Sequence, residues 1–480
     1  MLNFDAKKLN RLLFFLFSAS IFLLFTTFHF ATNWEWSLLG DDYNYYHLVK
    51  TSAMTAWQLA LEQIEVFGAE GRFVPLYSLF VNFWWKTLPL SPFAFHFFLY
   101  FVFVLIIIST YLLTASFEVR SRLMLLGAVF LFIFSQRAIL DVLVLTSIPE
   151  TWLILFLSIG LLLYRKSPIW ARISFLLSAL LKEPGWIAFA AAGAVGLWDY
   201  FVLKDSKKRL YSALFDILIF VAVAIFIKQV SLGRGQSYLQ SYSFFSFSTI
   251  YNFGLGLLKS SFVLLPVTFL LLATGSARFW RYMNRVQLRF FFFSLIYALG
   301  YLGLVAPRNA SGYLTIPAAY MFSIMAIILT MVIIQTRSER FERKLVFFPF
   351  LLLISLVLFQ SIYRQEGFKN GLYQTTTRTR ELASSPNRSL LLLQGHEQIV
   401  NTRLYLSEIK SNDEVRIVNQ DNVDYAMGFP GSVFALLNIK HFPWREEATT
   451  IIKNSCPDLL LQLKTSHIEL YQCKKAPSST

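Results

Sequence analysis

The sequence predicts a mainly α-helical, polytopic membrane protein of about eleven transmembrane helices, followed by a small C-terminal α/β domain. The 480-residue chain is 56% hydrophobic and 17% aromatic but only 15% charged, and its mean hydropathy is +0.54. Apolar runs of roughly twenty residues recur between Leu12 and Tyr363, and each can cross a hydrocarbon core of about 30 Å. From Arg364 onward the apolar runs shorten to strand length.

The first apolar run, Leu12 to Ala31, is too long for the core of a signal peptide and lacks a small-residue cleavage site. We therefore expect it to be retained as the first span. Lysine and arginine are concentrated in the N-terminus and in alternate loops, including those with Arg172, Lys204–Arg209 and Arg278–Arg289. The positive-inside rule assigns these to the cytoplasm, which leaves the C-terminus outside an inner (plasma) membrane.

The net charge of +15 does not indicate nucleic-acid binding, because the cations lie in the loops between apolar spans.

Two parts of the helical prediction are less regular than the rest. Residues 73–88 are predicted to form an interfacial or re-entrant helix within a first external loop at about residues 33–91. The spans on either side of Lys182 are short.

The domain boundary is predicted at residue 363, with a transmembrane domain at 1–363 and an external, periplasmic α/β domain at 364–480. Four segments of the second domain read as strands: SLLLLQG, EVRIVNQ, PDLLLQL and HIELYQC. If the last hairpin turns near Lys464, Cys456 and Cys473 face each other and can form a disulfide in an oxidising compartment. Two free, partly buried thiols are the alternative.

Charged and polar residues gather in the loops that this topology places outside. They are Asp41, Asp42, Arg72, His96, Arg137, Glu150, Lys182, Glu183, Arg308 and Tyr313. Ionisable residues near membrane depth cost about 2.5–3.5 kcal/mol each on insertion scales, which makes them candidates for a functional site.

The Lys182–Glu183 pair interrupts an apolar stretch from Ile173 to Leu197. Adjacent residues on a helix do not face each other. Pro184 and Gly185 therefore predict a chain turn at the outer surface, which lets both side chains point into one cavity. The alternative is a charged interfacial hairpin between two short spans.

Asp41 and Asp42 have two interpretations, as catalytic carboxylates or as solvated loop acids that cap a helix. Transfer of a sugar from a lipid phosphate needs both positively and negatively charged side chains, and these loops supply both. The departing phosphate needs cations, and the incoming hydroxyl needs a carboxylate base. A second carboxylate can orient the acceptor or help to hold Mg²⁺ or Mn²⁺. Attack opposite the phosphate inverts the anomeric centre.

The ordered set resembles the GT-C superfamily of polytopic, lipid-phosphate-sugar-dependent glycosyltransferases, in particular the O-mannosyltransferase branch and related bacterial enzymes. The segments that carry the resemblance are Asp41–Asp42, GRFVPL with Arg72, SPFAFH with His96, Arg137 and Glu150, LLKEPGW with Lys182–Glu183, and RNASGYLTIP with Arg308 and Tyr313. The TPR repeats of that branch are replaced here by the small α/β domain.

The resemblance implies Asp41 as the catalytic base, with Asp42 as its orienting partner or an alternate base. It implies that Arg72, Lys182 and Arg308 hold the lipid phosphate and that Glu183 positions Lys182 or a sugar hydroxyl. Arg137, Glu150, Tyr313 and His96 complete the expected substrate-binding set, with a structural role as the alternative for His96.

The expected donor is a polyprenyl-phosphate sugar, and the acceptor is a glycan, lipid or protein, with a divalent cation left open. Two other functions stand as alternatives. A transporter or flippase of a lipid-linked glycan would also use charges in the membrane, but the sequence has none of the internal repeats usual for transporters. An O-antigen polymerase or ligase is the second.

Overall fold

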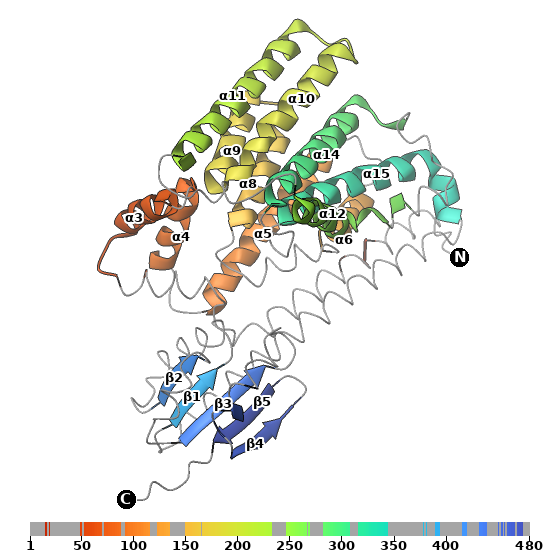
Figure 1. Ribbon diagram of the computed structural model, residues 1–480. Helices are drawn as coiled ribbons and strands as arrows, with labels where there is room; N and C mark the ends of the chain where they lie inside the picture. The colour runs from red at the N-terminus through yellow and green to blue at the C-terminus, as the bar shows by residue number, and fades with distance from the viewer. Residues whose placement is uncertain are drawn as a thin grey trace, which may run out of the picture. The chain divides into compact units, whose positions relative to one another are not determined.

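The computed structural model divides into two compact units, one helical and one that contains the C-terminal sheet (Figure 1). In the helical part of the chain the structure describes residues 52–69, 72–87, 92–115, 122–134, 149–164, 166–232, 246–265, 267–268, 282–307 and 315–343. In the C-terminal part it describes residues 389–393, 415–419, 432–438, 458–465 and 468–473. The other described positions are Phe15, Leu16, Ala19, Val49, Arg378, Glu381, Thr450, Lys453, Asn454 and Cys456.

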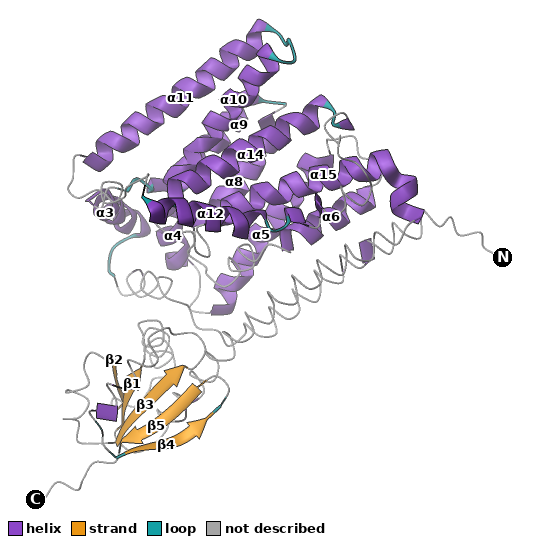
Figure 2. Cartoon of the chain, turned by 45° about the vertical axis from the view of Figure 1, so that its right-hand side comes forward, coloured by secondary structure: helices purple, strands orange, loops and turns teal. Residues whose placement is uncertain are grey.

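The chain is mainly helical, as the composition predicts (Figure 2). The helices are α3 (Ala56–Ala69), α4 (Pro75–Thr87), α5 (Pro92–Ala115), α6 (Arg122–Phe134), α8 (Pro149–Tyr164), α9 (Pro168–Leu181), η1 (Glu183–Trp186), α10 (Ile187–Phe201), α11 (Lys207–Leu232), α12 (Phe247–Ser261), α14 (Arg285–Val305) and α15 (Ile316–Arg343). Local signals set several of their starts. Proline occupies the first positions of α8 and α9, and Asn284 and Gln287 form a capping box at α14.

Three described helices are long and apolar enough to cross a membrane, at Lys207–Phe226, Arg285–Val305 and Ile316–Ile333. Shorter apolar helices cover Tyr100–Ala115, Pro149–Tyr164 and Pro168–Leu181. The prediction of about eleven spans is therefore not confirmed by the residues that the structure describes. These helices differ in burial, since the span in α15 is wholly buried whereas the span in α11 is mostly exposed. An exposed apolar helix of this kind presents its side chains to lipid.

Small residues let the helices α10 and α11 approach closely. A Cβ atom at Gly193 would lie 2.6 Å from the Ile217 side chain, and one at Gly196 would lie 2.7 Å from Ala213 Cβ. Close backbone approach of this kind is how helices associate when lipid supplies no hydrophobic drive. The two glycines therefore allow α10 and α11 to pack tightly against each other.

Ion pairs hold α9, α10, α11 and α14 together at the end where α10 stops and α11 begins. Arg172 Nε of α9 lies 2.6 Å from Asp216 Oδ1 of α11. Arg289 of α14 lies 2.8 Å from Asp199 Oδ2 of α10 and 2.9 Å from Asp205 Oδ2 in the connecting loop. The sequence predicts both arginines in cytoplasmic loops. The structure places them within the helices α9 and α14 rather than in loops, and both are neutralised there by aspartates.

The residues predicted as an interfacial or re-entrant helix contain α4, and α3 precedes it as a helix that the sequence analysis does not anticipate. The two helices pack on each other, and Asn82 Nδ2 donates to Gln63 Oε1 at 2.7 Å. Between them lies the short segment Arg72–Val74. The packing of α3 on α4 therefore positions this segment, which contributes Arg72 to the candidate site.

The C-terminal unit contains one five-stranded mixed sheet of order β2-β1-β3-β5-β4. Its strands are β1 (Ser389–Leu393), β2 (Val415–Asn419), β3 (Ser432–Asn438), β4 (Leu459–Lys464) and β5 (Ile468–Cys473). β1 pairs in parallel with β2 and β3, and β5 pairs antiparallel with β3 and β4. The four predicted strands are confirmed. The sequence analysis misses the central strand β3, whose buried Val433, Ala435 and Leu436 anchor the sheet.

Cys456 and Cys473 form a disulfide with a Cα–Cα distance of 6.0 Å, so the first of the two alternatives for the cysteines is confirmed. The geometry differs from the expected pairing across strands. Cys473 faces Leu459 in the β4–β5 register, and Cys456 lies before β4 begins. The bond therefore ties the segment that enters β4 to the end of β5.

Replacing both cysteines with serine should destabilise the C-terminal unit by about 3 kcal/mol, because the disulfide closes a loop with a sequence separation of 17. Denaturant unfolding of the full chain, followed by intact mass to count free thiols, measures this difference. Wild type treated with reductant should match the double variant. Equal stability of the oxidised and reduced wild type would contradict the prediction.

Candidate active site

The turn that joins α9 to α10 is built by the segment Lys182–Trp186. The helix α9 ends because Lys182 takes an extended conformation, φ −154° and ψ 133°. Its backbone N–H still bonds to Ser178 O at 3.2 Å, and its carbonyl accepts the N–H of Gly185 at 2.8 Å. A Cβ atom at Gly185 would lie 2.4 Å from Ser178 O, so only glycine fits against α9 here. The predicted turn at Pro184–Gly185 is confirmed.

Lys182 forms a buried ion pair with Glu150, which lies in the first turn of α8. Glu150 is fully buried and Lys182 is 4% exposed. Nζ of Lys182 donates to Oε1 of Glu150. The other carboxylate oxygen, Oε2, has no hydrogen-bond partner within the described ranges. A buried pair of this kind costs desolvation when it forms, but removing one partner leaves a buried charge uncompensated.

Glu183 points to a different partner from its neighbour Lys182. Its Oε1 accepts the backbone N–H of Phe73 at 3.2 Å and lies 3.8 Å from Arg72 Nε. The side chains of Arg72 and Glu183 are about equally exposed, at 19% and 21%. The carboxylate therefore attaches the Arg72 segment, which joins α3 to α4, to the turn between α9 and α10.

Arg72 is fixed from a second direction by Phe67, near the end of α3. Its guanidinium carbon lies 4.9 Å from the centre of the Phe67 ring, and its backbone N–H donates to Phe67 O at 2.8 Å. A guanidinium over an aromatic face is attracted by the ring quadrupole. The terminal Nη groups make no ion pair or hydrogen bond with any residue that the structure describes. The two Nη groups of Arg72, here called the Arg72 fork, are thus held in place as a pair of hydrogen-bond donors.

Aromatic side chains of α11 line this part of the molecule. Phe226 packs edge-on against Phe73 with ring centroids 5.1 Å apart. Phe220 stacks on Trp186 at 4.6 Å. The charged residues therefore lie beside an apolar, exposed helix that is long enough to span a membrane. This arrangement suits a ligand with a charged head and a hydrocarbon tail.

The structure brings together four of the residues that the sequence singles out: Arg72, Glu150, Lys182 and Glu183. It differs from the expectation in how they pair, since Lys182 bonds to Glu150 and Glu183 bonds to the Arg72 segment. Five others lie outside the described residues, namely Asp41, Asp42, Arg137, Arg308 and Tyr313. His96 belongs to α5, but the structure does not describe its side chain.

Phe67 and the backbone of Phe73 are contributors that the sequence analysis misses. Their positions before and after Arg72 in the chain are the only signal that could have indicated them. Among the described residues no group of three or more His, Cys, Asp or Glu is arranged to hold a metal ion. The possible metal ligands Asp41 and Asp42 lie outside that part of the chain.

The chain matches no protein-family model, and no curated protein matches it. Among solved structures it is similar to ArnT from Cupriavidus metallidurans in the apo state, with 12% sequence identity and a TM-score of 0.45 over 95% of this chain and 98% of that one. A second structure of that protein, bound to undecaprenyl phosphate, gives 12% identity and a TM-score of 0.46 over 96% of this chain and 97% of that one.

Replacing Glu150 with glutamine should destabilise the helical unit by about 3–5 kcal/mol, because the ammonium of Lys182 stays buried without its counter-charge. The double variant Glu150→Leu with Lys182→Met should recover most of this loss, since an apolar pair of similar volume needs no desolvation. Thermal unfolding in detergent measures both effects. Additive losses in the double variant would show that the two side chains do not interact.

Proposed function

We propose that the protein is a glycosyltransferase of the GT-C type that moves a sugar from a polyprenyl-phosphate donor to an acceptor hydroxyl outside the membrane, with inversion. The observation that carries the proposal is the fixed Arg72 fork. Glu183 and Phe67 hold this guanidinium beside the exposed apolar helix α11. A planar guanidinium whose two terminal groups are bonded to no described residue can bind a phosphate through two parallel hydrogen bonds.

In the proposed reaction the oxygen of the acceptor hydroxyl attacks the anomeric carbon from the face opposite the phosphate. The bond between that carbon and the phosphate oxygen breaks, and its electron pair leaves with the polyprenyl phosphate. Asp41 takes the proton of the hydroxyl, and Asp42 orients Asp41 or replaces it as base. Arg72 and Arg308 stabilise the charge that develops on the departing phosphate.

The buried Glu150–Lys182 pair gives Lys182 a role different from the one that the resemblance implies. An ammonium that is 4% exposed and bonded to a carboxylate lies away from solvent and is already neutralised. We therefore assign Lys182 and Glu150 as positioning residues that hold the α9–α10 turn. Glu183 is a positioning residue as well, acting on Arg72. Arg137, Tyr313 and His96 keep their proposed places in the substrate-binding set.

The C-terminal unit is proposed to lie outside the membrane and to take part in choosing the acceptor. The disulfide supports an oxidising location, since such bonds persist mainly outside the cytoplasm. The proposed location of the chain is the inner membrane, with residues 1–363 as the catalytic domain and 364–480 as the external domain. Asp41 and Asp42 are also the residues that would hold a divalent cation.

Replacing Asp41 or Asp42 with asparagine should abolish turnover while donor binding persists, because the base is lost and the phosphate ligands are not. The assay follows release or transfer of radiolabelled sugar from a panel of polyprenyl-phosphate sugars, using protein purified in detergent. Asp458→Asn, at an exposed position of the C-terminal unit, is the matched control. Tight binding with no turnover of any donor by the wild type would overturn the proposal in favour of a transporter.

Replacing Arg72 with lysine should weaken donor binding by about 10–150-fold, because a charged hydrogen bond contributes about 1.5–3 kcal/mol and lysine lacks the fork. The loss should be equal for the sugar-loaded donor and for polyprenyl phosphate without sugar, since Arg72 contacts the phosphate. Arg122→Gln, at an exposed arginine in α6, is the control. A loss confined to the sugar-loaded donor would place Arg72 on the sugar instead.

A further inference from the structure

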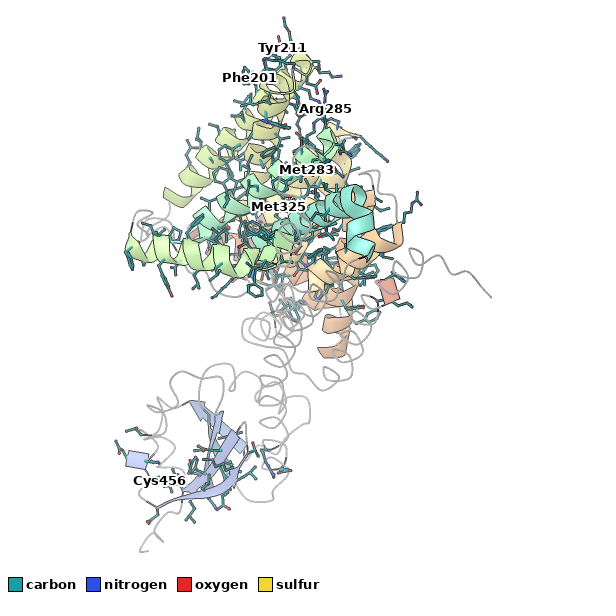
Figure 3. The ribbon with its side chains drawn as sticks, turned by 90° about the vertical axis from the view of Figure 1, so that its right-hand side faces the viewer. Phe201, Tyr211, Met283, Arg285, Met325 and Cys456 are labelled. Carbon is teal, nitrogen blue, oxygen red and sulfur yellow. A yellow bond between two sulfur atoms is a disulfide. The ribbon has the colours of Figure 1, made fainter. Side chains whose placement is uncertain are left out.

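Five exposed cations gather at the end of the helical unit opposite the Arg72 site. We call them the cationic rim: Lys166, Lys204, Lys207, Lys208 and Arg285. Figure 3 shows Phe201, Tyr211 and Arg285 together at this end. The pairing of Arg172 with Ser212 Oγ at 2.7 Å places the α8–α9 turn, with Lys166, beside the start of α11.

Within the part of the chain that the structure describes, no acid forms an ion pair with a cation of the cationic rim. Residues 164–216 and 282–290 contain only four acids, and Glu183 lies at the other end of α9. The remaining three form ion pairs with arginines outside the cationic rim. Asp216 pairs with Arg172, Asp199 with Arg289, and Asp205 with both Arg289 and Arg209. The backbone N–H of Ser206 and the two arginines beside it hold the pKa of Asp205 below its ordinary value of 3.8, so this acid stays charged and committed to them.

Aromatic side chains alternate with these cations and face outward. Tyr211 is 67% exposed, Phe201 60% and Trp170 59%. Aromatic residues with this exposure are typical of the boundary between the hydrocarbon and the headgroups of a bilayer. The cations and these aromatic residues thus share one exposed end of the helical unit.

Lys204 supplies an independent observation. Its φ of 53° lies in the left-handed region, where it follows the end of α10. Glycine is the usual residue at this position because it has no Cβ to clash. The chain thus keeps a strained lysine in the loop where glycine would relieve the strain. Orientation by the positive-inside rule needs cations on this side of the membrane, but not one at a left-handed position.

We infer that the cationic rim binds the headgroups of anionic phospholipids in the leaflet that this end of the helical unit enters. The complementarity is between unneutralised ammonium and guanidinium groups and lipid phosphates, with the aromatic residues packed among the adjacent acyl chains. This inference does not rest on the proposed glycosyltransferase function.

The test titrates short-chain phosphatidylglycerol into detergent-solubilised full-length protein and follows the shift of the thermal unfolding midpoint. Lys204→Gly should bind phosphatidylglycerol about fivefold more weakly than the wild type, the loss expected for one surface cation. Its midpoint without lipid should be unchanged or higher, because glycine relieves the left-handed strain. Lys204→Arg should bind like the wild type, and high salt should abolish the difference.

Lys259→Gln is the matched control, since Lys259 is an exposed lysine of α12, a helix that is hydrogen-bonded through Asn252 to the opposite end of α14. It should leave the titration unchanged. Equal affinities of the wild type and Lys204→Gly would overturn the inference. So would an equal shift with phosphatidylcholine, which has no net charge, or with free glycerol phosphate, which has no acyl chains.

Discussion

The ion pair between Glu150 and Lys182 is the interaction on which the rest of the candidate site depends. It joins the first turn of α8 to the end of α9, and it draws the Lys182 side chain into the helical unit. Because Lys182 is extended and its neighbour begins a short 3-10 helix, the two adjacent side chains diverge. Glu183 is thereby left to face the Arg72 segment, which comes from a different part of the chain.

The two ends of the helical unit differ in how their charged side chains are paired and exposed. At the Arg72 end, the described cations and acids are at least partly buried and are paired across segments distant in sequence. At the other end the arginines inside the helices are paired with aspartates, and the remaining cations are left exposed. The helix α8, which extends from Glu150 almost to Lys166, is about 24 Å long at the usual rise per residue. That length is somewhat less than a hydrocarbon core of about 30 Å.

Sequence patterns predicted much of this organisation for identifiable reasons. The turn at Pro184–Gly185 could be predicted because proline and glycine interrupt helices through local backbone effects. Four strands were readable from their length and β-branched or leucine-rich composition. The central strand β3 was missed because it pairs with β1 and β5, which are far from it in the chain, and nothing local distinguishes it from other apolar runs.

The sequence by itself determined that the protein is helical and apolar, that its C-terminal part forms strands, and which polar residues are candidates for a site. Composition and periodicity record such properties because they depend on neighbours along the chain. Only the tertiary structure decided that Lys182 bonds to Glu150 and that Glu183 bonds to the Arg72 segment. Adjacent residues in a turn can point to either side, and which partner each one meets depends on helices that are packed from elsewhere in the sequence.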